Sequence, residues 1–457
     1  MPNRRTVLRT VGATGLLGLG GCTGGDGGKT TDPPPTEPKS SESGATDTPT
    51  TLGPIEAVQT EKLADSDGEE YDYFGSAVAV SADGTTAVVG ARNDDDQTGS
   101  ASIFERSGGS WSWSAKLFPE DEAAPVAFGT DVAIGAGGDR VFVSAPSGGG
   151  VSVFDRTTDG WARQAVLHPP GDRLAFGRAI AASRDGQSLL VGNPAGDRLT
   201  IRYRPDQSVR GSAFVFEFED SWEAAGTLQA DEYGAASNFA FDVALADDGE
   251  TAIVGAPLRV VVEGEETSNP DDAVASAAVF ERSGGSWGRV RTLTARDGTA
   301  NETFGGAVAT DSDASVALVG APYDEPAGLT RGGVVYAYTG EGFDAETSIV
   351  PAGHDADFMF GYALDLSADG TTALLSARGP AGDNGYNAGA AYAFGRAGRD
   401  WRELATLIAG DGDRGDYFGR SVATSADGGS VVAGAETDED PHGEDCGAAY
   451  HFALESA

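Results

Sequence analysis

The stretch Asp72-Tyr73-Phe74-Gly75-Ser76-Ala77-Val78-Ala79-Val80 decides the fold, because its pattern recurs along the chain. Sixteen residues after Phe74 comes Gly90, and six further Phe residues are followed by Gly or Ser at the same offset. The repeated positions are Phe74, Phe128, Phe176, Phe239, Phe304, Phe360 and Phe418, which lie 54, 48, 63, 65, 56 and 58 residues apart. One spacing that occurs seven times indicates a repeated structural unit.

Each unit begins with a predicted β-hairpin. In the first unit, Val78 and Val80 alternate with small residues, the turn dipeptide Asp83-Gly84 follows, and Ala87-Val88-Val89 returns. Asp-Gly between such runs favours a tight hairpin turn, because both central positions of that turn require a positive φ. The same dipeptide recurs at Asp185-Gly186, Asp248-Gly249, Asp369-Gly370 and Asp427-Gly428.

Two more strands complete each unit. The third strand follows a loop of variable length, as in Ala101-Ser102-Ile103-Phe104. The fourth strand runs from an aromatic residue to an aliphatic one six positions later: Trp111 to Leu117, Trp161 to Leu167, Trp222 to Leu228, Trp287 to Leu293, Phe343 to Ile349 and Trp401 to Leu407. Four short strands per unit are typical of a propeller blade. We interpret these aromatic residues as packing residues and not as a platform for sugars.

The seventh unit lacks a fourth strand at the C-terminus, since the chain stops at Ala457 soon after its third strand. Residues Ile55 to Leu63 precede the first Phe-Gly pair and resemble the missing strand. The sequence therefore predicts an all-β fold over residues 54–457: a seven-bladed β-propeller of four-stranded antiparallel blades, closed by the N-terminal strand that completes the last blade.

The first 53 residues differ from the rest. Residues 1–22 contain Arg4 and Arg5, a short apolar stretch, and Leu19-Gly20-Gly21-Cys22. This order resembles a twin-arginine export signal that ends at a lipobox, so Cys22 is expected to carry a lipid after cleavage; the alternatives are an uncleaved anchor or a chance Cys. Residues 23–53 are rich in Thr, Pro, Ser and Gly, which predicts a disordered tether.

The formal net charge is −40, from 71 acidic and 31 basic residues, of which only four are Lys. Acid-rich, Lys-poor surfaces resemble those of proteins from salt-loving organisms, where salt screens the repulsion between like charges. Nucleic acid is excluded as a partner, since its recognition needs a basic surface.

Phe74-Gly75 together with Val89-Gly90-Ala91 and Val254-Gly255-Ala256-Pro257 resembles the motifs of FG-GAP repeat proteins, which include the N-terminal propeller of integrin α chains. Three positions depart from that pattern, namely Ala240, Ser144 and Ser376. The resemblance implies the propeller fold. The calcium loops of integrin-type repeats are not expected here, because a four-residue turn with one Asp offers too few oxygen ligands.

The sequence contains few candidates for catalytic or metal-binding residues. The segment 437–446 holds several carboxylates with His442 and Cys446, which could bind a metal or form an acidic solvated loop. Asp94-Asp95-Asp96 is interpreted as surface charge, and Arg414-Gly415-Asp416 as a chance occurrence of an adhesion tripeptide. No phosphate loop, dinucleotide fingerprint or hydrolase elbow is present, so no catalytic, metal or cofactor site is predicted.

The loops between the second and third strands vary most in length, and Asn193 to Gly211 and Pro257 to Ser276 are the longest. Since such variation gathers on the binding face of repeat proteins, we expect a binding module. The predicted export signal and lipid would hold it on the outer face of the cell membrane by its N-terminal lipid alone. The expected partner is a surface protein or a glycan. The alternative is an extracellular enzyme acting on polysaccharide, which acids with His in the central funnel would favour; small residues there would favour binding.

Overall fold

The computed structural model describes residues 55–120, 126–170, 175–194, 211–229, 238–257, 275–295, 303–340, 342–379, 385–439 and 443–456. The chain divides into two units, residues 1–48 and 49–457, and the described residues all lie in the second. None of the helices within them is long and apolar enough to cross a lipid bilayer. Arg4, Arg5, Cys22 and the tether lie outside the described residues, so the export signal and the lipid remain predictions.

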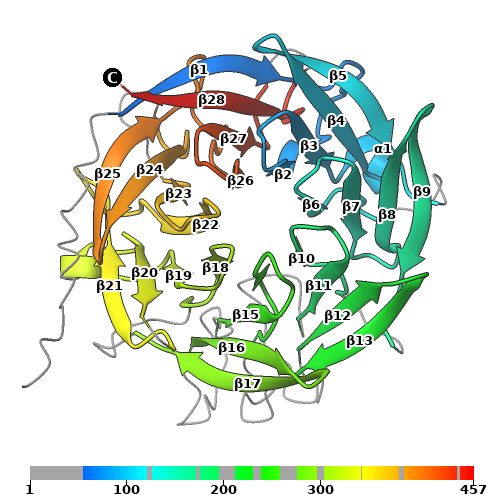
Figure 1. Cartoon of the computed structure of the whole chain (residues 1–457). Coiled ribbons are helices and arrows are strands. Elements are labelled where there is room, and N and C mark those ends of the chain that lie inside the picture. The colour runs from blue at the N-terminus through cyan, green and yellow to red at the C-terminus, as the bar shows by residue number, and fades with distance from the viewer. Residues whose placement is uncertain are drawn as a thin grey trace, which may run out of the picture. The chain divides into compact units, whose positions relative to one another are not determined.

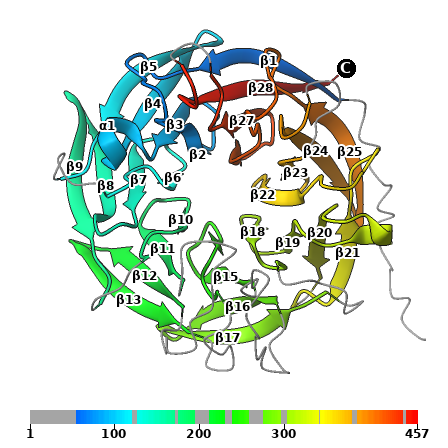
Figure 2. The ribbon, with the colours of Figure 1, turned by 180° about the vertical axis from the view of Figure 1, so that it is seen from behind.

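The described residues form seven four-stranded antiparallel sheets, arranged as blades around a central axis (Figures 1 and 2). The innermost strands are β2 (Phe74–Val80), β6 (Val132–Ile134), β10 (Ile180–Ala182), β14 (Val243–Leu245), β18 (Ala307–Thr310), β22 (Phe360–Leu366) and β26 (Val422–Thr424). The second strands are β3 (Thr86–Ala91), β7 (Arg140–Ala145), β11 (Ser188–Asn193), β15 (Thr251–Ala256), β19 (Val316–Ala321), β23 (Thr372–Ala377) and β27 (Ser430–Ala435).

The third strands are β4 (Ser100–Ser107), β8 (Gly150–Thr157), β12 (Ser212–Phe218), β16 (Ser276–Ser283), β20 (Val334–Thr339), β24 (Ala390–Ala397) and β28 (Ala448–Ser456). The outer strands are β5 (Ser110–Leu117), β9 (Gly160–Leu167), β13 (Trp222–Leu228), β17 (Ser286–Leu293), β21 (Ala345–Ile349), β25 (Asp400–Leu407) and β1 (Ile55–Leu63). Two short helices, α1 (Asp94–Gln97) and η1 (Pro326–Gly328), lie in loops. Blades are numbered by their innermost strand, from blade one at β2 to blade seven at β26. The predicted seven-bladed fold is confirmed.

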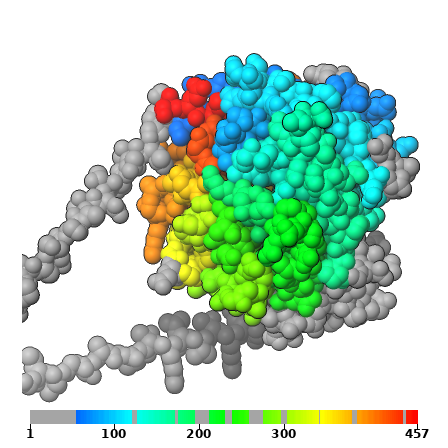
Figure 3. Space-filling view, turned by 45° about the vertical axis from the view of Figure 1, so that its right-hand side comes forward, coloured from blue at the N-terminus to red at the C-terminus, as the bar shows by residue number. Residues whose placement is uncertain are grey.

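The N-terminal strand closes the ring as predicted. β1 pairs antiparallel with β28, with Leu63 opposite Ala449 and Gln59 opposite Phe452, and so becomes the outer strand of blade seven. The blue N-terminal strand and the red C-terminal strand accordingly lie side by side in Figure 1, and both reach the surface in Figure 3.

Buried polar contacts reinforce this closure. The ring of His451 on β28 is hydrogen-bonded to Thr60 on β1 and, at 2.8 Å, to Ser430 on β27. Trp111 of blade one packs on the same ring, with 5.1 Å between ring centroids. Burial, together with the positive charge of nearby Arg106, lowers the pKa of His451 to about 4, so the imidazole is neutral at pH 7.

Lys116 on β5 ties the connection after β1 to blade one. Its Nζ lies 2.9 Å from Asp65, 2.8 Å from Asp67 and 2.8 Å from Asp94. Asp65 and Asp94 are both buried. The interpretation of the Asp94-Asp95-Asp96 run as surface charge is therefore wrong for Asp94, because Lys116 compensates its charge in the interior; the other two are exposed.

A ring of backbone hydrogen bonds joins the innermost turns of the blades in the described part of the chain. Each N–H donates to the carbonyl of the corresponding residue in the next blade, and the last donates back to the first, at 2.8–3.2 Å. Its members are Ala82, Ala136, Arg184, Asp247, Ser312, Ala368 and Ala426. Each satisfies a donor and an acceptor that the hairpin turn leaves unpaired. The propeller is thus closed twice, at its axis by this ring and at its rim by β1.

The repeated Phe residues anchor the blades. All seven are buried, and each meets aromatic residues of the third strand in its own blade at 5.4–6.4 Å between ring centroids. Trp161, Trp222, Trp287 and Trp401 are half-buried and pack against the hydrophobic clusters between blades. These Trp residues therefore pack as the sequence predicts.

The Gly residues of the two motifs meet across each junction between blades. A Cβ atom added to Gly90 of blade one would lie 2.2 Å from the carbonyl oxygen of Gly129 in blade two. The pairs around the ring are Gly90 with Gly129, Ser144 with Gly177, Gly192 with Ala240, Gly255 with Gly305, Gly320 with Gly361, Ser376 with Gly419 and Gly434 with Gly75. Each pair keeps at least one Gly, which explains why the three departures from the motif are tolerated: none occurs opposite another.

Candidate functional site

A cavity of about 210 Å³ lies at one mouth of the central channel, where the innermost strands begin. Most of its wall comes from the second and third residues after each repeated Phe. These are Ser76 and Ala77, Thr130 and Asp131, Arg178 and Ala179, Phe241 and Asp242, Gly306 and Ala307, Tyr362 and Ala363, and Arg420 and Ser421. The buried Phe and the tight Gly junction hold the backbone, so the residues that follow face the axis.

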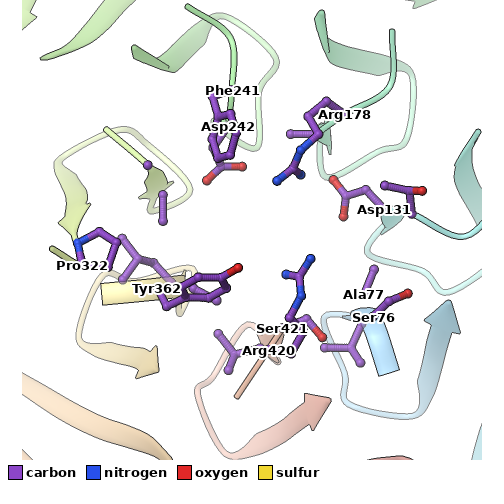
Figure 4. Close-up of a pocket in the computed structure, with 18 of the residues that line it drawn as sticks. Ser76, Ala77, Asp131, Arg178, Phe241, Asp242, Pro322, Tyr362, Arg420 and Ser421 are labelled. Carbon is purple, nitrogen blue, oxygen red and sulfur yellow. The ribbon is translucent and has the colours of Figure 1, made fainter. Parts of the chain in front are cut away.

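The wall is uneven. At these two positions blades one and five contribute only Ser, Ala or Gly, whereas each of the other five blades carries one large polar side chain: Asp131, Arg178, Asp242, Tyr362 or Arg420. Figure 4 shows the polar ends of all five pointing into the cavity from five blades. The site is therefore assembled from separate repeats and depends on the closed ring.

The two carboxylates also brace neighbouring blades. Asp131 accepts hydrogen bonds from the N–H groups of Val132, at 2.9 Å, and of Ile180 in the next blade, at 2.7 Å. Asp242 likewise accepts from the N–H of Val308 in the next blade at 2.7 Å. Burial raises the pKa of Asp131 to about 7 and that of Asp242 to about 6, although these hydrogen bonds act in the opposite direction.

Arg178 and Arg420 face one another across the cavity (Figure 4). The guanidinium of Arg178 stacks on Phe241 at 4.5 Å from the ring centroid. Burial lowers the pKa of Arg178, and the positive charge of Arg420 lowers it further, since two like charges in a half-buried site disfavour each other.

Arg420 is held by a carboxylate that it shares. Its Nε donates to Glu436 at 2.9 Å, and Arg92 contacts the other oxygen of Glu436. Burial opposes ionisation of Glu436, but the guanidiniums of Arg420 and Arg92 outweigh it and lower its pKa to about 2.

The hydroxyl of Tyr362 is hydrogen-bonded to an arginine of the same blade. Arg378 donates to the Tyr362 hydroxyl at 2.9 Å, and its guanidinium lies 4.2 Å from the ring centroid of Tyr417. Burial raises the pKa of Tyr362, but the positive charges of Arg420 and Arg378 outweigh burial and lower it overall.

A second cavity of about 340 Å³ continues along the axis toward the turn ring and shares Asp131 and Asp242 with the first. Asp365 is the charged residue that blade six adds there. It accepts from the N–H of Thr424 in blade seven at 2.7 Å, and burial raises its pKa to about 6. Ala, Val, Leu and other uncharged residues line most of this end, where Arg184 and Asp247 also form an ion pair. We call the first cavity, with Asp131, Arg178, Asp242, Tyr362 and Arg420, the charged mouth of the channel.

The sequence-predicted candidates lie elsewhere. In the Arg414-Gly415-Asp416 tripeptide, Asp416 is buried and accepts from the N–H of Asp413 at 2.6 Å, so its carboxylate does not face solvent as an adhesion loop requires. Cys446 is buried, with Sγ 3.4 Å from the carbonyl oxygen of Asp438. His442 and most of both long loops lie outside the described residues.

The acidic segment 437–446 contributes to the closure of the ring. Asp438 lies 3.0 Å from Lys62 Nζ on β1 and 2.5 Å from the hydroxyl of Tyr450. Within the described residues no group of three or more His, Cys, Asp or Glu is arranged to hold a metal ion. The short turns explain the recurrent Asp residues instead: Asp83, for example, accepts from the N–H of Thr85 at 3.0 Å.

Inspection of the sequence did not single out the cavity residues, although a signal was present. Aligning the units on their Phe shows mostly small residues at the third position and Asp131 and Asp242 as the exceptions. None of the described residues that line the mouth is a His. The funnel thus combines the small residues expected of a binding site with charged groups that were not predicted.

Comparison with known families agrees with this architecture. Residues 57–104, 287–338 and 401–452 match the FG-GAP repeat. Each matched segment begins in the outer strand of one blade and continues through three strands of the next, so the sequence repeat and the blade are out of phase by one strand. The first matched segment accordingly begins in β1, the outer strand of blade seven. No curated protein matches the chain.

Proposed function

We propose that this chain, an FG-GAP repeat β-propeller, is an exported, lipid-anchored binding module that recognises a protein or a glycan at the cell surface. Binding takes place on the face that carries the charged mouth of the channel. The long loops 193–211 and 257–276 connect second strands to third strands, and the described strand ends that flank them, Asn193 with Ser212 and Ala256 with Ser276, lie at that same face.

One observation carries the proposal: large polar side chains from five blades converge on a cavity, whereas blades one and five have only Ser, Ala or Gly at the corresponding positions (Figure 4). A propeller does not need them to close, because small residues suffice at the corresponding positions. Taking charged groups out of water costs free energy unless they are compensated, so their convergence supports a binding role.

The alternative is an enzyme acting on polysaccharide, since two carboxylates with raised pKa values share the cavity, as in glycosidases. Both carboxylates, however, accept backbone N–H groups of the next blade and so serve as braces between strands. Arg178 also lies between them in Figure 4. These contacts favour recognition without catalysis.

The anchor is tested with Cys22→Ser in the full chain. We expect the protein to move from the membrane fraction to the medium, because the N-terminal lipid on Cys22 is its proposed attachment. Protein that stays in the membrane fraction after this change would show a different anchor, such as an uncleaved signal.

Recognition is tested by capture from a cell-envelope extract at high salt. A variant with loops 193–211 and 257–276 shortened should lose the partner that the native chain captures. The matched control replaces Gly284-Gly285, in the β16–β17 hairpin turn on the opposite face, with serines. Equal capture by the native and loop-shortened chains, with unchanged unfolding curves, would refute recognition through this face.

A further inference from the structure

The charged mouth gathers positive charge within a strongly acidic chain. Arg178, Arg420, Asp131 and Asp242 line the cavity, and Glu436, Arg92 and Arg378 lie directly behind it, where Glu436 contacts Arg420 and Arg92 and where Arg378 contacts Tyr362. Four guanidiniums against three carboxylates leave one positive charge when all seven groups are ionised, whereas the chain as a whole carries −40. The excess arises because Glu436 alone serves two arginines.

The orientation of the arginines places that charge where a ligand can reach it. Arg178 from blade three and Arg420 from blade seven point into one cavity from opposite sides (Figure 4). Two guanidiniums that face each other repel, and the repulsion is strong where water is partly excluded. An anion between them reverses the sign of the interaction, and the planar fork of a guanidinium fits a carboxylate with two parallel hydrogen bonds.

The remaining wall favours a sugar as the carrier of that anion. Asp131 and Asp242 each use backbone N–H groups on one side, but a carboxylate has about four acceptor positions, so each can also accept a hydroxyl donor. Phe241, Pro322 and Tyr362 add apolar surface. A cavity of about 210 Å³ is smaller than the ~300 Å³ at which pockets for whole small molecules begin, so it fits one residue of a longer ligand.

We propose that the charged mouth binds an acidic sugar residue of a glycan, with its single carboxylate between Arg178 and Arg420 and its hydroxyls on Asp131 and Asp242. This inference rests on the proposed binding function and names its ligand class. A dianion such as sulfate is disfavoured, because it exceeds the single positive charge of the site and faces the two carboxylates.

The test is a ligand-observed NMR titration of the full chain at constant ionic strength with D-glucuronate, D-glucose and N-acetylglycine, and with sulfate, which has no protons, added as a competitor of glucuronate. Glucuronate should bind, and the other three should bind at least about ten-fold more weakly, the factor expected for losing a charged hydrogen-bonding pair. Equal binding of glucose would overturn the role of the carboxylate. Equal binding of N-acetylglycine would overturn the assignment to a sugar in favour of a peptide terminus, and preferred binding of sulfate would overturn the charge argument.

Variants locate the site. Arg178→Gln and Arg420→Gln should each weaken glucuronate binding about ten-fold or more. The matched control is Arg184→Gln, in the same blade as Arg178 but at the other end of the channel, and it should leave binding unchanged. Arg178→Lys keeps the positive charge but lacks the planar guanidinium, so it should retain part of the affinity. It replaces Arg178→Gln in the test if the glutamine variant does not fold.

Unchanged binding in both glutamine variants would place glucuronate elsewhere and overturn the inference. The proposed function is tested separately by capture from envelope extract. If the native chain captures a partner yet does not bind glucuronate, the acidic-sugar inference fails and the binding function stands. If glucuronate binds the mouth but no partner is captured, the proposed recognition of a surface ligand fails instead.

Discussion

Replacing Gly90 with Ala should separate blades one and two. The new Cβ would lie 2.2 Å from the carbonyl oxygen of Gly129, far inside the 3.0 Å that real Cβ contacts almost never pass. The backbones must move apart by roughly 1 Å, which forfeits about a quarter to a half of the dispersion attraction between facing atoms. Overpacking of this kind costs about 1–3 kcal/mol, and a lower entropy of the unfolded chain returns up to about 1 kcal/mol. We expect a net loss of about 2 kcal/mol.

The matched control separates this clash from backbone strain. Gly108 has a φ of +60° and nothing within 4 Å of an added Cβ, so Gly108→Ala introduces strain alone, about 1 kcal/mol. Gly129 combines both, with a φ of +83° and a Cβ position 2.2 Å from the carbonyl oxygen of Ser100, and Gly129→Ala should be the most harmful of the three. Urea unfolding at fixed salt measures all three free energies. If Gly90→Ala costs no more than Gly108→Ala, the Gly pairs do not set the spacing of the blades.

Two further predictions concern the closure of the ring. An unfolded His has a pKa near 6.5 and folded His451 a pKa near 4, so the stability that neutral His451 contributes is present above pH 6.5 and falls by about 3 kcal/mol as the pH falls toward 4. The difference in unfolding free energy between the native chain and His451→Gln should shrink by that amount from pH 7 to pH 4. A constant difference would show that His451 does not titrate in this way. Lys116→Met leaves the buried Asp65 and Asp94 without their cation and should lower the unfolding free energy, measured in urea at pH 7, by about 3 kcal/mol. As the control, Arg184→Met breaks an exposed ion pair and should lower it by less than about 1 kcal/mol. Equal losses would contradict the argument that burial makes the Lys116 pairs important.

The fold was predictable because its determinants are local and repeated. The Phe spacing, the Asp-Gly turns and the odd strand at each end of the propeller follow from short stretches of sequence, and β1 has the predicted bounds Ile55–Leu63. The turn ring could not be predicted, since it uses backbone groups of Ala82 and its equivalents, which have no characteristic side chain. The burial of Asp94 was missed for another reason: its partner Lys116 comes from a different strand.

The candidate site was harder to predict than the fold. A loop was expected to carry recognition, whereas the charged mouth is built from Asp131, Arg178, Tyr362 and others on separate repeats, more than 40 residues apart. Their proximity follows only once the ring is closed and the units are aligned on their Phe. Sequence spacing alone does not reveal that Arg178 and Arg420, in blades three and seven, face each other.

Within each repeat, the positions that pack the blades differ from the positions that line the candidate site. The Phe fills the core of its own blade and the Gly after it fits the neighbouring blade, so both are constrained by packing. The next two residues line the channel, and their side chains vary from blade to blade: Ala77, Gly306 and Ala307 are small, whereas other blades carry charged groups there. A guanidinium at the same position, as in Arg178, adds a charge that the neighbouring repeats do without and that repels Arg420 across the axis. The proposed binding of an anion would relieve this repulsion, because the anion would attract both guanidiniums.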